Sequence, residues 1–400
     1  MNQFFINLKK NRHIIVYIML IITIFVGLHY RLFFAYNVNF TNLHQGTEFG
    51  HDEFNYQEMA ANIVNKHIYG YMSDGTPNAY VTPGYPLFLA MIYSIFGIGP
   101  KSVLYIKIIQ AILSTISIFL VFLIGKRISN KYVGLIAAIF IAIYPPLILY
   151  SRFLLTETLY TFLFLLYFLV QLIAMEKEKL IWHFVAGLLI ASAILVRPLI
   201  FILMPLPYIY KYFTVKSDRG KITKQFGILA LGFITLMLPW WIRNIITIHK
   251  FIFLCTQCNP FYYGIIHNYS ELPPSSNETY DGIKLIIHNL MTNPIDTIKW
   301  YTIGKLNIIC GSQDYWLQNN QVYLSSLSMW HYIIMITGAI GITMSIFKSE
   351  IRLISIFIIL NMGVQLLFIP VPRYAVPIVP LISICGAYML WYLFKQCTTT

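Results

Sequence analysis

Long hydrophobic runs separated by short polar links make up most of the chain. About 20 consecutive apolar residues cross the hydrocarbon core of a bilayer, and runs near this length recur along the sequence. They predict roughly ten membrane-spanning helices, at 14–34, 102–124, 132–150, 153–175, 181–197, 199–212, 225–246, 327–347, 351–369 and 374–394. The first run lacks a small-residue cleavage site, so we expect it to remain as an anchor. The pattern is that of an all-α polytopic membrane protein with a single transmembrane domain over residues 1–400.

The first of two long polar segments covers residues 36–83 and contains an amphipathic pattern. Apolar residues at helical spacing follow Asp52 and continue to about residue 66, which predicts a helix at the membrane interface. The run Thr82-Pro83-Gly84-Tyr85-Pro86 then predicts a turn into an apolar segment at 87–96. Asp52 and Glu53 are therefore expected at the start of an interface helix.

The second long polar segment covers residues 247–326. Its Ser, Asn and Pro residues at 270–280 predict a flexible connector. Two apolar stretches follow, at 283–291 and 295–309, and both are too short to span a bilayer comfortably. We predict that they are helices lying along the outer interface.

Composition agrees with this pattern, because 58% of the residues are hydrophobic and only 11% are charged, whereas soluble domains carry about 25% charged residues. Lys and Arg in short loops mark the cytoplasmic side. With the N-terminus inside, the short basic links fall inside and both polar segments fall outside. The net charge of +13 mostly reflects this bias, and no basic patch with interleaved aromatic residues indicates nucleic acid. We expect a multi-pass protein of the plasma membrane with its functional site on the outer face.

Three carboxylates near the predicted outer face are candidate catalytic residues: Asp52, Glu53 and Glu157. Asp52 can cap the interface helix, with Glu53 favouring the positive end of the helix. Alternatively, one of these two is a general base that faces a cavity, and both descriptions can hold together. Glu157 begins a predicted span, where ionisable side chains usually face protein or a cavity. Its structural alternative is a pair with Arg152, although a spacing of five residues is poor on a helix.

Several cations near the same face oppose the positive-inside bias. Arg243 follows Pro-Trp-Trp-Ile, Arg373 begins the last predicted span, and Arg197 and Lys305 lie near this face as well. Any one of them can be an interfacial side chain that extends its stem along apolar surface. As a group they form a candidate site for a lipid-linked phosphate, because guanidinium groups bind phosphate bidentately.

Together, the acids and cations predict group transfer at the outer face with a polyprenyl phosphate as the leaving group. A carboxylate would accept a proton from the incoming acceptor. No Gly-rich phosphate loop is present, so no nucleotide is expected. Cys255 and Cys258 form a lone CxxC, and zinc would need a second ligand pair. No metal site is predicted, although a divalent ion at the acids stays open.

An ordered set of motifs along nearly the whole chain resembles the GT-C class of membrane glycosyltransferases. The likeness is to the branch that contains protein O-mannosyltransferases and the aminoarabinose transferase of lipid A. The motifs are Asp52-Glu53-x-x-Tyr56-x-x-x-Ala60, Thr82-Pro83-Gly84-Tyr85-Pro86-Leu87-Phe88-Leu89-Ala90, Tyr144-Pro145-Pro146 with Thr156-Glu157, Leu195-Val196-Arg197-Pro198, Pro239-Trp240-x-x-Arg243-Asn244 and Arg373-Tyr374-x-x-Pro377.

This resemblance implies inverting sugar transfer from a polyprenyl- or dolichyl-phosphate donor, with an acid of the first outer loop as the base and no required cofactor. It implies the following roles: Asp52, Glu53 and Glu157 as catalytic acids, Arg243, Arg373, Lys305 and Arg197 as ligands of the donor phosphate, and Tyr56, Tyr85 and Trp241 as lining of the substrate site. The acceptor would be a lipid, a glycan or a protein. The sequence ends after its last predicted span, without the soluble C-terminal domain of many relatives, which leaves the acceptor open.

Two other functions fit parts of the pattern. A transporter or flippase of a lipid-linked sugar would also need many spans and lipid-facing cations. Transport sites, however, lie near the midplane between structural repeats, and this chain has no visible repeat and few charges at midplane. An oligosaccharide polymerase or ligase would keep the same donor chemistry and change only the acceptor.

Overall fold

The computed structural model describes residues 12–37, 48–71, 76–215, 218–255, 259–267, 272–273, 275, 277–311 and 324–399. Every regular element within these ranges is helical. Cys258 of the predicted CxxC and parts of both predicted outer loops fall outside the described residues.

Five helical stretches of the described chain are long and apolar enough to cross a membrane: Ile14–Tyr36, Pro100–Ile128, Thr156–Lys177, Arg219–Ile248 and Pro372–Thr398. They belong to α2 (Arg12–Asn37), α5 (Pro100–Ile128), α8 (Thr156–Lys177), α11 (Arg219–Ile248) and α16 (Val379–Thr399) with the turns before it. Shorter apolar helices complete the bundle: α4 (Gly84–Phe96), α6 (Lys131–Ala142), α9 (Leu180–Val196), α14 (Leu324–Met344) and α15 (Arg352–Gln365). The prediction of an all-α polytopic membrane protein is confirmed.

Proline residues divide three of the predicted spans. The predicted span 132–150 consists of α6 and a short α7 (Pro145–Tyr150). The predicted span 199–212 consists of a 3-10 segment (Pro198–Leu203) and α10 (Leu206–Thr214), and the last span begins with two 3-10 turns. A proline ring removes an N–H donor and clashes with the preceding turn, so the regular helix ends there and restarts.

The helix that carries the first acid pair begins earlier than predicted. α3 runs over Glu48–Lys66, so Asp52 is in its second turn and does not cap its N-terminus. The alternative in which Asp52 caps this helix is therefore wrong. Glycine lowers helix stability by about 1 kcal/mol relative to alanine in a helix interior. Gly50 lies in the first turn of α3, so the sequence pattern does not predict that the helix begins there.

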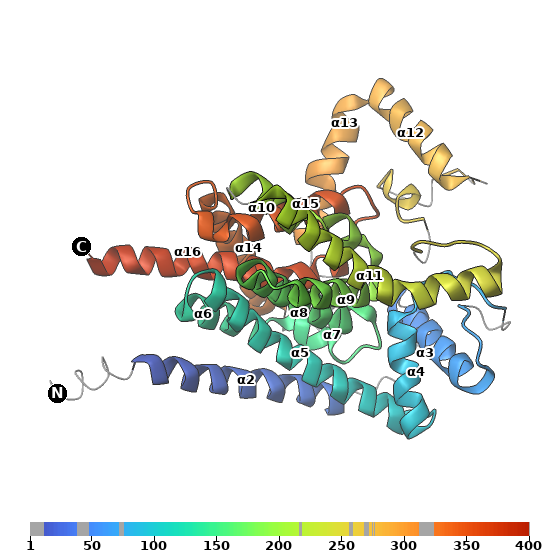
Figure 1. The fold of residues 1–400 in the computed structure, drawn as a ribbon, viewed down its shortest axis with the longest axis horizontal. Helices are drawn as coiled ribbons and strands as arrows, with labels where there is room; N and C mark the ends of the chain where they lie inside the picture. The colour runs from blue at the N-terminus through green and yellow to red at the C-terminus, as the bar shows by residue number, and fades with distance from the viewer. Residues whose placement is uncertain are drawn as a thin grey trace.

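Figure 1 shows how the bundle is arranged. α2 begins and α16 ends on one side of the molecule, and α3 and α4 lie on the opposite side. α12 (Glu278–Thr292) and α13 (Pro294–Lys299) stand away from the bundle, followed by two π-helical turns over Trp300–Gly304 and Asn307–Gly311. The helices predicted at 283–291 and 295–309 are therefore present, the second with π-helical turns.

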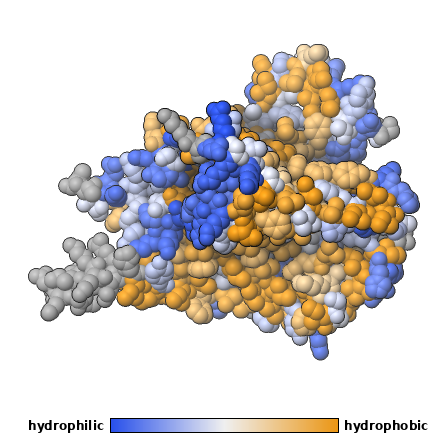
Figure 2. Space-filling model, viewed as in Figure 1, coloured by the Kyte–Doolittle hydropathy of each residue, from blue (hydrophilic) through white to orange (hydrophobic). Residues whose placement is uncertain are grey.

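Polar side chains gather at the ends of the bundle. Figure 2 shows hydrophobic residues over most of the visible face and hydrophilic residues over α10 and the start of α11. At that end Glu178 accepts from Lys211 at 2.7 Å and from Lys221 at 2.5 Å. These are links that the basic-residue bias predicts to be cytoplasmic.

A turn between α3 and α4 packs directly onto the end of α9. The Thr82 hydroxyl donates to the carbonyl of Val196 at 3.3 Å. A Cβ atom on Gly84 would lie 2.7 Å from the carbonyl of Leu195, so only glycine fits this close approach. This contact places the first outer loop beside Arg197, at the mouth of the site described next.

Candidate active site

A cavity of about 430 Å³ opens where α3 meets the ends of α8, α9 and α15. Segments that are distant in sequence line it, at 52–56, 80–82, 155–164, 196–199 and 361–378, together with Cys255 and Pro260. All of these belong to the side of the bundle that the loop charges predict to be extracytoplasmic. A pocket of this size is in the range of small-molecule sites, roughly 300–1,000 Å³.

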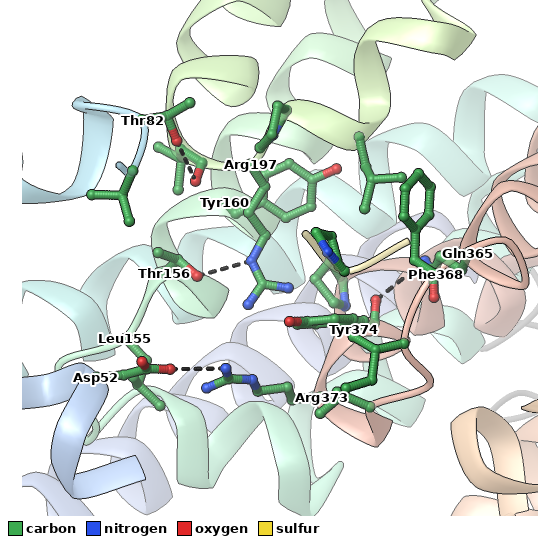
Figure 3. A pocket seen from close by; sticks show the side chains of 18 of the residues that line it. Asp52, Thr82, Leu155, Thr156, Tyr160, Arg197, Gln365, Phe368, Arg373 and Tyr374 are labelled. Atoms are coloured by element: carbon green, nitrogen blue, oxygen red, sulfur yellow. Dashed lines mark hydrogen bonds and ion pairs between the residues drawn. The ribbon is translucent and has the colours of Figure 1, made fainter. Parts of the chain in front are cut away.

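Two arginines and two carboxylates form one charged cluster at this cavity. Arg373 Nη2 lies 2.8 Å from Asp52 Oδ2, and Arg197 Nη2 lies 2.5 Å from Glu157 Oε1. Arg373 Nε lies 3.8 Å from the same Glu157 oxygen, so Glu157 bridges the two guanidinium groups. Figure 3 shows Arg197 and Arg373 extending from different elements toward the same part of the cavity, with Asp52 at its edge.

Both arginines lie outside the regular α-helices. The residue before a proline is disfavoured in the α region, so α9 ends at Val196 and Arg197 is extended, with φ of −144°. Its Nε then donates to Thr156 Oγ1 at 2.8 Å. Arg373 lies in the 3-10 turn Pro372–Tyr374, and the ring of Tyr374 lies against both guanidinium groups, at 5.1 Å from Arg197 and 5.6 Å from Arg373.

Glu157 is the most deeply buried member of the cluster, with 1% of its surface exposed. Its partners are Arg197 and Arg373, so the alternative of a pair with Arg152 is wrong. The guanidinium of Arg152 instead lies over the rings of Phe34 and Phe153. The second carboxylate oxygen of Glu157 has no hydrogen-bond partner among the described residues.

Glu53 turns away from the cavity, unlike its neighbour Asp52. Its Oε1 accepts from the backbone N–H of Leu154 at 2.6 Å, which holds the segment that leads into α8. Burial raises the pKa of Glu53 to about 7, while the Leu154 hydrogen bond and the nearby cations Lys107 and Arg152 act in the opposite direction.

Arg243 and Lys305 do not line the cavity, and both hold backbone segments. Arg243 donates to the carbonyls of Tyr69 at 2.6 Å and Asn78 at 2.9 Å, on the two sides of the first outer loop. The fully buried Lys305 donates to the carbonyls of Leu366 at 2.7 Å and Phe368 at 3.1 Å. Burial lowers the pKa of Lys305 to about 7.

The three predicted aromatic residues also differ in position. Tyr56 lines the cavity one turn after Asp52, and its ring meets that of Tyr85 at 5.1 Å. Tyr85 is fully buried behind it and donates to Gln110 at 2.9 Å. Trp241 lies away from the cavity and donates to the carbonyl of Phe253 at 3.1 Å.

The family described as dolichyl-phosphate-mannose-protein mannosyltransferase matches residues 80–242, which is less than half of the chain. The archaeal oligosaccharyltransferase AglB from Archaeoglobus fulgidus, solved with an inhibitory peptide and a dolichol-phosphate, superimposes with a TM-score of 0.65 at 17% identity, over 97% of this chain and 51% of that one. ArnT from Cupriavidus metallidurans, solved with undecaprenyl phosphate, gives a TM-score of 0.53 at 13% identity, over 95% of this chain and 60% of that one.

The chain has the GT-C fold. The resemblance inferred from the motifs is thereby confirmed, and the comparisons give no support to a transporter. This GT-C chain spans about half the length of the oligosaccharyltransferase it resembles. No curated protein sequence matches it significantly.

The GT-C cavity includes polar residues that the sequence patterns did not predict. Asn361 and Gln365 lie four residues apart on α15 and face the cavity together with Tyr374. The available signal was two amides at helical spacing in an otherwise apolar span, because buried polar residues in membrane helices usually mark functional sites. Tyr374 was visible only as the neighbour of Arg373.

A metal ion finds no evident set of ligands in the described part of this GT-C chain, where no three His, Cys, Asp or Glu side chains cluster. Cys255 lines the cavity, but its CxxC partner is outside the described residues. The carboxylate of Asp52 is already paired with the guanidinium of Arg373 at 2.8 Å.

Proposed function

We propose that this protein is an inverting membrane glycosyltransferase that moves a sugar from a polyprenyl-phosphate donor to an acceptor on the extracytoplasmic face of the plasma membrane. The observation that carries the proposal is the cavity in which the carboxylate of Asp52 and the guanidinium groups of Arg197 and Arg373 lie together. The GT-C fold and the lipid phosphates named for the two structural relatives support it.

The donor phosphate would bind against Arg197 and Arg373, because two guanidinium groups can hold its oxygens and stabilise the charge that develops on the leaving group. Glu157 is a positioning residue in this proposal. It contacts both arginines from the buried side and so fixes the position of their guanidinium groups at the cavity.

Asp52 would be the general base. The hydroxyl oxygen of the acceptor attacks the anomeric carbon of the donor sugar and transfers its proton to the Asp52 carboxylate. The bond between the anomeric carbon and the phosphate oxygen breaks, and its electron pair leaves with the polyprenyl phosphate. Attack from the face opposite the phosphate inverts the configuration. The reaction as written uses no cofactor.

The resting ion pair between Asp52 and Arg373 suggests how donor binding would prepare the base. At 2.8 Å, Arg373 occupies one oxygen of the Asp52 carboxylate. A phosphate that binds Arg373 competes for the same guanidinium and releases the carboxylate for the acceptor. Donor binding would then weaken the ion pair that Asp52 forms with Arg373 in the resting protein.

The proposal is tested with purified protein in proteoliposomes that contain polyprenyl-phosphate sugars. The measured quantity is the release of free polyprenyl phosphate in the presence of lipid, glycan or peptide acceptors. Release by the wild-type protein that is lost in Asp52→Asn supports the proposal. Passage of the intact labelled lipid across the bilayer, without release, would replace it with a flippase.

A further inference from the structure

The cavity contains a second polar site, on the α15 wall and separate from the charged cluster. Asn361 and Gln365 lie one helical turn apart in the sequence RLISIFIILNMGVQ, and only 9% and 8% of their surfaces are exposed. An amide buried in an apolar environment costs free energy unless its donors and acceptors are matched. The pair therefore calls for a physical explanation.

The hydrogen bonds of the pair leave one donor and one acceptor without a partner among the described residues. Gln365 Nε2 donates to Asn361 Oδ1 at 2.8 Å and to the carbonyl of Tyr374 at 3.3 Å. Asn361 Oδ1 thus accepts a hydrogen bond, while its Nδ2 donates to no residue in the described part of the chain. The Oε1 acceptor of Gln365 is buried without a hydrogen-bond partner in the described part of the chain. The pair therefore combines an unused donor on Asn361, which lines the cavity, with a buried and unmatched acceptor on Gln365.

The three parts of a lipid-linked sugar differ in whether they can form the missing hydrogen bonds. A phosphate requires cations, which Arg197 and Arg373 supply in the charged cluster. A polyprenyl tail is apolar and would leave both amides unmatched. A sugar hydroxyl carries lone pairs without a full charge, so it can accept a hydrogen bond from the unused amide N–H of Asn361.

Tyr374 fixes the amide pair relative to the phosphate site. Its carbonyl holds Gln365, while its ring lies against Arg197 and Arg373. Figure 3 shows Gln365 and the two arginines on either side of Tyr374. If the phosphate of the donor binds the two arginines, the sugar attached to it is the part of the donor that would contact the amides.

We propose that Asn361 is a specificity-determining residue that hydrogen-bonds a hydroxyl of the transferred sugar, and that Gln365 is a positioning residue that orients it. This inference rests on the proposed function, because it assumes that the cavity binds a polyprenyl-phosphate sugar. It adds where the chain distinguishes one sugar from another.

Binding without turnover tests the proposal. Purified protein in nanodiscs is titrated with polyprenyl phosphate, polyprenyl-phosphate mannose and polyprenyl-phosphate glucose, and each Kd is measured without acceptor. We expect the wild-type protein to bind at least one sugar-bearing lipid more tightly than the bare lipid. Asn361→Leu, which keeps the size and removes the amide, should reduce that preference about tenfold and leave the Kd of the bare lipid unchanged. Gln365→Met should act in the same direction.

The matched control is Leu360→Ala, on the neighbouring position of α15 with its side chain exposed on the outer surface of the bundle. It should not change the preference. Equal weakening of all three lipids by Asn361→Leu would indicate a structural role and overturn the inference, as would an unchanged preference. Wild-type protein that binds the bare lipid and the sugar lipids equally would overturn the inference and leave the proposed function standing. Failure of the wild type to bind any polyprenyl phosphate would remove both.

Discussion

Arg243→Met tests whether Arg243 holds the first outer loop or binds the donor phosphate. Its guanidinium donates to the carbonyls of Tyr69 and Asn78. A hydrogen bond from a charged donor contributes about 1.5–3 kcal/mol, so the two together contribute roughly 3–6 kcal/mol in a dry site. Arg243 is only half-buried, and water can replace part of both bonds. We therefore expect the loop to lose about 2–3 kcal/mol of local stability.

Amide hydrogen exchange measures this loss of local stability, because the backbone N–H of Asn78 donates to the carbonyl of Tyr69 at 3.2 Å. A loss of that size corresponds to exchange at Asn78 that is roughly 30- to 140-fold faster. The affinity for polyprenyl phosphate should stay within about threefold of the wild type, since Arg243 does not line the cavity.

Arg373→Met is the matched comparison, because Arg373 does line the cavity. It should weaken the binding of polyprenyl phosphate by about tenfold or more, as expected for the loss of a charged hydrogen-bond donor, and leave exchange at Asn78 unchanged. The opposite pattern, with weakened lipid binding and normal exchange in Arg243→Met, would refute the assignment of Arg243 as a loop anchor.

Two further predictions concern pH. Burial raises the pKa of Glu53 to about 7, so the folded protein holds this proton more tightly than the unfolded chain, and its contribution to stability is lost as pH rises through about 7. The Tm of the wild type should therefore fall from pH 5 to pH 8 by more than that of Glu53→Gln, which keeps an oxygen for Leu154; parallel curves would contradict this. Burial lowers the pKa of Lys305 to about 7, so between pH 7 and its usual value the unfolded chain binds more protons and stability rises with pH. Lys305→Met should abolish that rise in Tm between pH 7 and 9. An equal rise in both proteins would contradict the claim that burial lowers the pKa of Lys305.

The sequence predicted the class of the fold because membrane helices need little beyond apolar length. The prediction of continuous spans failed where a proline ends one helix and begins the next, as between α6 and α7. Hydropathy measures only how apolar the residues are, so it does not detect the N–H donor that a proline lacks. The prediction also misplaced Asp52 in α3, because the glycine in the first turn interrupts the helical pattern.

The site was only partly predictable for a different reason. From the sequence alone, a cationic side chain near the outer face can extend to the lipid headgroups, hold a loop or bind a ligand. Only the tertiary contacts separate Arg373, which meets an acid 321 residues away, from Arg243, which holds two backbone carbonyls. In the same way Asp52 and Glu53 are adjacent in sequence, but successive residues of a helix point in different directions, so one faces the cavity and the other holds a backbone N–H.

This contrast supplies the most direct test of the proposed transferase. Sugar transfer from a polyprenyl-phosphate donor is measured in proteoliposomes for the wild type, Asp52→Asn and Glu53→Gln, with the folded fraction of each determined in parallel. We expect Asp52→Asn to lose transfer by about 10²-fold or more, as for the removal of a general base, and Glu53→Gln to retain it at neutral pH. Normal turnover in Asp52→Asn would contradict the assignment of the base, and loss of transfer in Glu53→Gln alone would move that role to its neighbour.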